Sequence, residues 1–71
     1  MPFVEINVWK ENMDDSKKEK LIKEVSQDVS EIVGTPLYAV EVIINEIPKA
    51  NWGKGGIQSS KWIQGQFSPK G

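Results

Sequence analysis

Hydrophobic and polar residues alternate over residues 3–9, and over residues 39–46 every second residue from Val40 to Ile44 is β-branched and apolar. A period of two that is rich in β-branched residues predicts a β-strand with one apolar face. That face carries Val4, Ile6 and Val8 in the first segment, and Val40, Val42 and Ile44 in the second. We therefore predict two strands, separated by about thirty residues of a different pattern.

Between the two predicted strands, apolar residues recur at helical spacing over residues 15–33. Asp14 and Asp15 supply N-cap chemistry and negative charge at the start of this segment, and Gly34 and Pro36 follow its end. The apolar stripe consists of Leu21, Ile22, Val25, Val29, Ile32 and Val33. One long helix is predicted, and strand–helix–strand predicts a βαβ unit with parallel strands and a right-handed crossover.

Glycine and proline are concentrated in residues 47–56, which predicts turns. Three of these glycines permit a tight turn with positive φ: Gly53, Gly55 and Gly56. No strand–loop–helix context supports a phosphate-binding loop there. Residues 57–71 are predicted to form a hairpin or short strand and then a tail. The fold class is therefore α+β, a βαβ unit with a C-terminal turn or hairpin, with the domain at residues 1–61 and the tail at residues 62–71.

Two strands and one helix form a marginal structure in water. Phe3, Trp9 and Ile43 fall on the face opposite the helix, and Trp52 and Trp62 lie outside the βαβ unit. Single exposed apolar residues are common, but three tryptophans in 71 residues favour buried contacts. We therefore expect copies of the chain to associate by sheet extension and face-to-face packing, with aromatic residues at the contacts.

The amino-acid composition excludes several kinds of catalytic and binding site. The nine basic residues are all lysines, and cysteine and histidine do not occur, so thiol catalysis is excluded and a metal site would need carboxylates alone. Without arginine, bidentate guanidinium binding of a carboxylate is also excluded. The net charge of −1 argues against a nucleic-acid partner. No apolar run spans a membrane and no signal peptide is evident, so we expect a cytoplasmic protein without a membrane partner.

Four segments together carry a family resemblance. Pro2 directly follows the initiator methionine, residues 21–26 read Leu-Ile-Lys-Glu-Val-Ser, and residues 42–46 read Val-Ile-Ile-Asn-Glu. The loop at residues 48–56 reads Pro-Lys-Ala-Asn-Trp-Gly-Lys-Gly-Gly. Each segment alone is unspecific, but their order and spacing over residues 2–61 resemble the 4-oxalocrotonate tautomerase family, the small amino-terminal-proline tautomerases.

The resemblance implies a tautomerase-type fold assembled as a homohexamer, a trimer of dimers, that uses no cofactor and no metal. It also implies that Met1 is removed and that Pro2 becomes the catalytic residue. Its amine would shuttle a proton on a small enol or 2-hydroxydienoic acid similar to 2-hydroxymuconate, which gives the keto form. In the family, two arginines hold the substrate and an aromatic residue of the glycine loop lines the pocket.

Pro2 is also a candidate catalytic base on chemical grounds, apart from the resemblance. Removal of Met1 would leave a secondary amine, and α-amino groups titrate at about 7.7–8.0 in model peptides. Burial in an apolar site lowers that pKa, and a base that titrates near the working pH suits general acid–base catalysis. The alternative is a proline that merely starts a strand. A retained Met1 would make the Pro2 nitrogen an amide with no basicity.

Trp52 stands at the position of the family's loop aromatic, where it would be an apolar wall for the substrate or a subunit-interface anchor. The family's first arginine is replaced, because residues 11–13 read Glu-Asn-Met, with one residue more than is usual before the helix. Asn12 and Met13 are therefore candidate substrate contacts. Glu41 aligns with the second arginine, where it would raise the pKa of the Pro2 amine and repel a dicarboxylate.

Lysines could replace the arginines as point charges. Lys10 is close in sequence to the first missing arginine and Lys54 lies in the glycine loop, although both are also ordinary surface lysines. A monoacid, a neutral enol or an aldehyde then fits the charge better than a dicarboxylate. Three functions stay open: a tautomerase, or a hydratase- or dehalogenase-like relative in which Glu41 orients water; a non-catalytic subunit of a mixed hexamer; and a binding module with exposed tryptophans.

Overall fold

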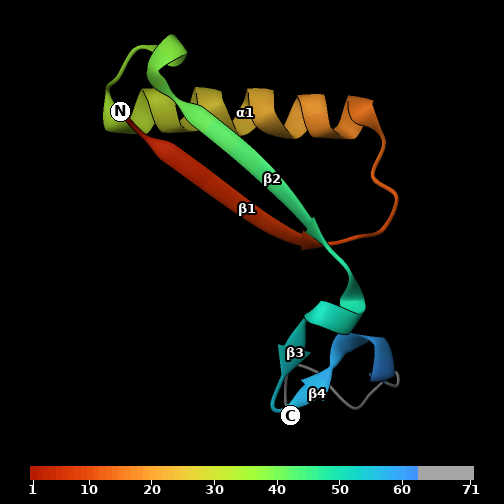
Figure 1. The fold of residues 1–71 in the computed structure, drawn as a ribbon. Helices are drawn as coiled ribbons and strands as arrows, with labels where there is room; N and C mark the ends of the chain where they lie inside the picture. The colour runs from red at the N-terminus through yellow and green to blue at the C-terminus, as the bar shows by residue number, and fades with distance from the viewer. Residues whose placement is uncertain (63–71) are drawn as a thin grey trace.

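A computed structural model describes residues 1–62 of the chain. The main elements in chain order are β1 (Phe3–Trp9), α1 (Asp15–Val33) and β2 (Glu41–Ile47). β1 and β2 pair in parallel, with Phe3 opposite Glu41 and Trp9 opposite Ile47, and α1 lies across one side of the pair (Figure 1). The predicted βαβ unit with parallel strands is therefore confirmed.

The helix begins and ends where its capping residues predict. A carboxylate oxygen of Asp14 accepts a hydrogen bond from the backbone N–H of Lys17 at 2.9 Å, which satisfies one of the free donors of the first turn. Gly34 follows the helix with a φ of 84°, in the left-handed region that favours glycine. Its backbone N–H donates to the carbonyl of Ser30.

The second strand starts later than predicted. Residues 39–46 were expected, but Leu37–Ala39 form a short 3-10 helix and β2 begins at Glu41. The backbone N–H of Ala39 donates to the carbonyl of Pro36, and that of Val40 donates to the carbonyl of Leu37. Because both donors serve the turn, neither joins the sheet. The alternating pattern continued through this turn and therefore did not reveal it.

A small hairpin follows the sheet and lies beyond the end of β2, away from the N-terminus (Figure 1). Its parts are a 3-10 helix (Lys49–Asn51), β3 (Gly53–Lys54), β4 (Ile57–Gln58) and a second 3-10 helix (Ser59–Lys61). Gly55 and Gly56 have φ values of 63° and 83°, as the predicted tight turn requires. A C-terminal hairpin is confirmed, but it begins at Gly53, before the segment 57–71 in which it was predicted. The predicted tail lies outside the described residues from residue 63 onward.

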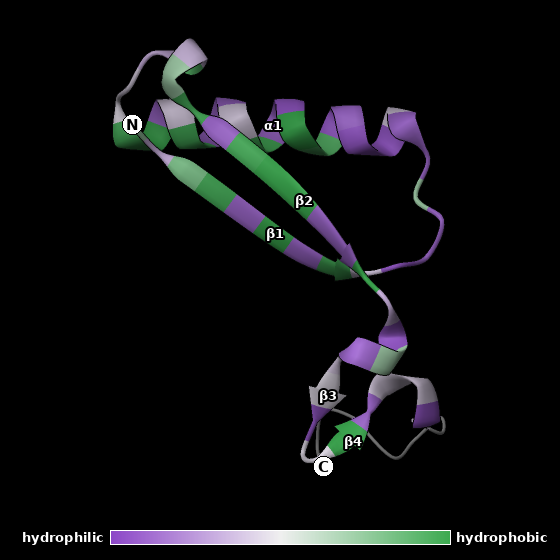
Figure 2. Ribbon diagram, in the orientation of Figure 1, coloured by the Kyte–Doolittle hydropathy of each residue, from purple (hydrophilic) through white to green (hydrophobic). Residues whose placement is uncertain are grey.

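Hydrophobic positions alternate with polar ones along the middle of β1, whereas β2 has an apolar stretch at residues 42–44 between polar residues (Figure 2). Val4, Ile6, Val42 and Ile44 are half-buried. Even so, no apolar side chain of residues 1–62 is fully buried. Part of the predicted helical stripe is uncovered, with Ile32 85% exposed and Val33 59% exposed. The radius of gyration is 15.6 Å, whereas a compact domain of this length has about 11 Å. One copy of the chain therefore leaves apolar surface that its described residues do not cover.

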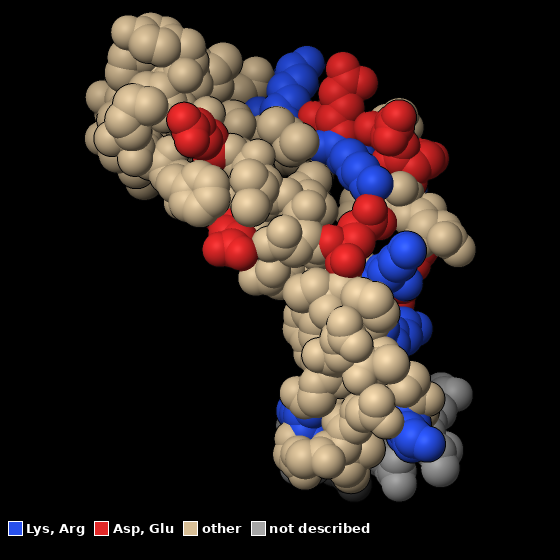
Figure 3. Space-filling model, viewed as in Figure 1, with Lys and Arg blue, Asp and Glu red and all other residues tan. Residues whose placement is uncertain are grey.

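Part of this uncovered surface lies where the N-terminus is beside the C-terminal end of α1 (Figure 1). Met1, Phe3 and Tyr38 are 87%, 58% and 90% exposed. Charged side chains gather instead over the other part of α1, and the N-terminal side of this view is mostly uncharged (Figure 3). None of the helices in residues 1–62 has the length and hydropathy needed to cross a membrane.

Candidate active site

Pro2 lies directly before β1, and the start of β2 fixes its backbone. The backbone N–H of Glu41 donates to the carbonyl oxygen of Pro2 at 3.0 Å, and Phe3 pairs opposite Glu41. Pro2 is half-buried, whereas Glu41 is exposed. The parallel register therefore brings two of the predicted site residues together at the N-terminal end of the sheet.

Three tryptophans meet at the opposite end of β1. The ring of Trp9 lies 6.2 Å from that of Trp52 and 5.3 Å from that of Trp62, both edge-to-face. The indole N–H of Trp62 donates to the carbonyl of Ile57 at 3.3 Å. This tryptophan cluster (Trp9, Trp52 and Trp62) joins the hairpin to the end of the sheet.

A pocket of about 440 Å³ opens beside the cluster. It is lined by Val8, Trp9, Glu11, Met13, Lys17 and Trp52, so four of its six lining residues are apolar or aromatic and two are charged. Apolar walls with a few charged groups are typical of small-molecule sites. We call this the tryptophan pocket.

The loop between β1 and α1 carries two of the lining residues. Asn12 has a φ of 59°, in the left-handed region that asparagine tolerates better than most residues, so the chain turns sharply there. Glu11 and Met13 flank this turn and both line the pocket. Asn12 itself is exposed and is not among the lining residues.

The charge of Glu11 is balanced by a lysine from the hairpin. The ammonium of Lys49 lies 3.4 Å from the carboxylate of Glu11 and 4.9 Å from the centre of the Trp9 ring, where the π-face attracts it. Lys49 therefore holds the loop before α1 against the tryptophan cluster.

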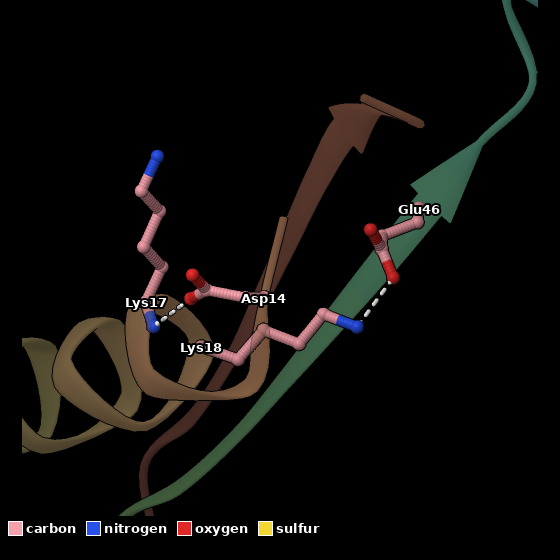
Figure 4. Close-up of polar contacts among 4 residues, drawn as sticks. All are labelled: Asp14, Lys17, Lys18 and Glu46. Atoms are coloured by element: carbon pink, nitrogen blue, oxygen red, sulfur yellow. Dashed lines mark hydrogen bonds and ion pairs between the residues drawn. The ribbon is translucent and has the colours of Figure 1, made fainter. Parts of the chain in front are cut away.

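Lys17 and Lys18 lie side by side in the first turn of α1 but have different partners. The ammonium of Lys18 lies 2.7 Å from a carboxylate oxygen of Glu46, and that hydrogen bond raises the pKa of Lys18 above its ordinary value. The ammonium of Lys17 points away from both Asp14 and Glu46 (Figure 4). Within residues 1–62 Lys17 forms no ion pair, although it lines the pocket.

The predicted site residues therefore fall into two groups within one chain. Met13 and Trp52 line the tryptophan pocket, whereas Pro2 and Glu41 lie at the other end of the sheet. A parallel strand rises about 3.3 Å per residue, so Pro2 and Trp9 lie roughly 20 Å apart.

Both lysines proposed as replacements for arginine, Lys10 and Lys54, are exposed and are not lining residues. Four of the six lining residues were not predicted as site residues: Val8 and Trp9 were assigned only to the first strand, Glu11 only to a departure from the family, and Lys17 was not singled out. The available signal was that Lys17 is a cation in the first turn of α1, directly after the loop that carries Met13.

Among the described residues, no group of three or more acidic side chains could hold a metal ion. The fold and these two groups instead define a class of small βαβ enzyme subunit. In this class a proline begins the sheet and a glycine-loop aromatic lines a pocket. The chain belongs to the Tautomerase family, whose model, described as tautomerase enzyme, matches residues 2–61.

Relatives and solved structures agree with this assignment. The chain is 44% identical to 2-hydroxymuconate tautomerase of Stutzerimonas stutzeri over 63 residues, which cover 89% of this chain and 97% of the relative. A 4-oxalocrotonate tautomerase isozyme from Methylibium petroleiphilum has a TM-score of 0.74 at 37% identity, covering 83% of this chain and 94% of that one.

A heterohexamer 4-oxalocrotonate tautomerase from Chloroflexus aurantiacus has a TM-score of 0.79 at 27% identity, covering 89% and 100%. The family resemblance and the tautomerase fold are thus confirmed, and the chain is a tautomerase, an isomerase.

Proposed function

We propose that this tautomerase converts a small enol or dienol acid into its keto form, with Pro2 as the catalytic residue after removal of Met1. The Pro2 amine accepts the enol hydroxyl proton, and the resulting ammonium returns a proton to a substrate carbon, so the reaction is an isomerisation. The similarity to 2-hydroxymuconate tautomerases supports a 2-hydroxydienoic acid as the substrate class.

The observation that carries this proposal is the position of Pro2. The hydrogen bond from Glu41 to the Pro2 carbonyl fixes its backbone at the head of β1, so that removal of one residue exposes its nitrogen. The chain has neither histidine nor cysteine. Their side chains are the two whose ordinary pKa values lie nearest neutrality, so the terminal amine is the strongest candidate base.

We further propose that the complete site forms between copies of the chain. Pro2 and the tryptophan pocket lie at opposite ends of β1, so a second copy in antiparallel orientation would place its pocket end against Pro2. The uncovered apolar surface of a single copy supports such association. A homohexamer, the trimer of dimers that the resemblance implies, would provide such contacts.

A non-catalytic subunit of a mixed hexamer is the second candidate, and Glu41 is the residue that favours it. Its backbone touches Pro2, and a carboxylate there would hinder the binding of an acidic substrate. One solved neighbour is itself a heterohexamer. A chain that gains activity only when mixed with a second family member would support this alternative.

The decisive experiment is the intact mass of the purified chain before and after reaction with a small halo-keto acid. We expect a mass without methionine and one adduct per chain, mapped to Pro2. In parallel, Pro2→Ala should lower kcat/KM for an enol monoacid, 2-hydroxy-3-phenylpropenoate, by about 100-fold, as expected when a general base is impaired. This variant still permits Met1 removal and therefore controls for processing. A retained Met1, or unchanged activity in Pro2→Ala, would reject the proposal.

A further inference from the structure

The charges around the tryptophan pocket point to its ligand class. We propose that the pocket binds a monocarboxylate with a flat apolar body and that Lys17 binds its carboxylate. This inference rests on the proposed function, because it takes the tryptophan pocket to be the part of the site that receives the substrate. The chain has no arginine, and this inference assigns to Lys17 the anion-binding role that a guanidinium would otherwise have.

The first step concerns which cation is available. Lys17 lines the pocket, and in the described part of the chain its ammonium has no carboxylate within ion-pair distance. Neighbouring Lys18 is already held by Glu46 at 2.7 Å. Lys17 is therefore the lining cation that can accept a carboxylate without breaking an existing ion pair.

Asp14, the acid at the cap beside Lys17, is engaged by the end of the helix. A carboxylate oxygen of Asp14 accepts hydrogen bonds from the backbone N–H of Lys17 at 2.9 Å and from the hydroxyl of Ser16 at 3.1 Å. These bonds turn the carboxylate toward the helix end, and the Lys17 ammonium points away from it (Figure 4). Asp15 lies in the same turn but does not line the pocket.

The second step concerns why one carboxylate is favoured over two. Glu11 is the lining acid, and the ammonium of Lys49 at 3.4 Å is already paired with it, so Lys17 is the one lining cation left to bind a carboxylate. A substrate with one carboxylate can pair with Lys17 and keep its remaining surface away from Glu11. A second carboxylate within this small pocket would find no further unpaired cation among the lining residues and would meet the apolar walls, which disfavour a charge.

The third step concerns the rest of the ligand. Val8, Trp9, Met13 and Trp52 give the pocket an apolar and aromatic lining. Its volume of about 440 Å³ lies toward the lower end of the range of about 300–1,000 Å³ for small-molecule sites. Trp9 and Trp52 meet nearly at right angles, with an interplanar angle of 80°, so a flat unsaturated body can lie along one ring and meet the edge of the other.

A binding experiment tests the role of Lys17 without any chemistry. The probes are 3-phenylpropionate and its neutral amide, 3-phenylpropionamide, titrated calorimetrically into the assembled wild-type protein. We expect the acid to bind about tenfold more tightly than the amide, as for one charge-assisted hydrogen bond. Lys17→Gln should abolish this preference, and Lys17→Arg should restore it.

Lys23→Gln is the matched control, because it removes the same charge from an exposed position on the same helix and outside the pocket. It should leave the preference for the acid unchanged. A wild-type protein that binds both probes equally, or a Lys17→Gln protein that still prefers the acid, would overturn the proposal. Equal losses in Lys17→Gln and Lys23→Gln would also overturn it, since they would indicate a general charge effect.

A kinetic arm separates this inference from the proposed function. With 2-hydroxy-3-phenylpropenoate, an enol monoacid, Lys17→Gln should raise KM about tenfold and leave kcat nearly unchanged, as expected for lost ground-state binding. If wild-type protein binds 3-phenylpropionate through Lys17 but turns over no enol acid, the proposed function fails and the role of Lys17 stands. If turnover is normal and Lys17→Gln leaves KM unchanged, the proposed function stands and this inference fails.

Discussion

The two ends of the β1–β2 sheet are built by different interactions. At the N-terminal end, Pro2 and Glu41 are brought together by strand register and a single backbone hydrogen bond. At the opposite end, ring contacts among Trp9, Trp52 and Trp62 hold the hairpin beside a pocket. The first end presents the candidate base and the second presents apolar walls with a cation. Under the proposed function, one copy would divide chemistry and recognition between its two ends.

The largest expected effect on stability comes from removing a ring of the tryptophan cluster. Trp9 contacts both other rings and the Lys49 ammonium, so Trp9→Ala removes the centre of the cluster. A fully buried Trp→Ala change costs about 3–5 kcal/mol, and because Trp9 is only half-buried we expect about 2 kcal/mol. Denaturant unfolding at fixed protein concentration measures this loss.

Trp9→Phe is the control for the same position, because it keeps a ring that can pack against Trp52. Trp9→Phe should retain most of the stability. The amide chemical shifts of the hairpin residues should stay close to those of the wild type, which would show that the hairpin keeps its position. If Trp9→Ala and Trp9→Phe unfold at the same denaturant concentration, the cluster does not anchor the hairpin.

The N-terminal end and the helix could be predicted from the sequence because their signals are local. The alternation of Val4, Ile6 and Val8 and the cap at Asp14 each depend on a few neighbouring residues. The start of β2 was missed because the turn after Pro36 uses the backbone N–H of Val40, which the side-chain pattern does not record.

The tryptophan end was only partly predictable. The three tryptophans were noticed, but their contact depends on where the hairpin lies against β1, which no short segment specifies. For the same reason Glu11 was noted only as part of the segment that replaces the family's first arginine, and Lys17 was not predicted as a pocket residue. The exposure of Ile32 was also unexpected, because helical periodicity shows an apolar face but not what covers it.

The hairpin turn permits a sharper comparison within the tryptophan end. Gly56 has a φ of 83°, where an alanine is strained, and the left-handed region costs a residue with a Cβ roughly 1–2 kcal/mol. Gly53 lacks a positive φ, and a Cβ there would meet only the Ile57 carbonyl oxygen at an ordinary 3.7 Å. Thermal unfolding should show Gly56→Ala clearly destabilised and Gly53→Ala close to wild type. Equal effects would mean that backbone conformation does not limit this turn.

At the N-terminal end, Glu41 tests whether a carboxylate tunes the candidate base. The charge of Glu41 should favour the ammonium form of the Pro2 amine and so raise its pKa. Glu41→Gln should therefore shift the acid limb of kcat/KM to lower pH, by about half a pH unit for a solvent-exposed neighbour. Glu5→Gln, farther along β1, is the control and should shift it less. A profile of Glu41→Gln that overlies the wild-type profile would show that the carboxylate does not influence the amine.

The smallest expected effect concerns the cap of α1, which positions Lys17 beside the pocket. The pKa of Asp14 lies below its ordinary value of 3.8, chiefly because its carboxylate accepts the backbone N–H of Lys17. A depressed pKa means that this stabilisation is present above pH 3.8 and is lost as the pH falls through the lower value in the folded state. Asp14→Ala should lower the melting temperature by a few degrees near neutral pH and by less in acid.

Asp14→Asn separates the cap from its titration, because asparagine caps a helix about as well as aspartate but stays neutral. Other carboxylates also titrate in acid, so the quantity to measure is the difference in melting temperature between each variant and wild type. For Asp14→Asn this difference should move in favour of the variant as the pH falls below about 3.8, where only the wild-type cap becomes protonated. A difference that stays constant across the acid range would show that the Asp14 carboxylate does not stabilise the helix through its charge.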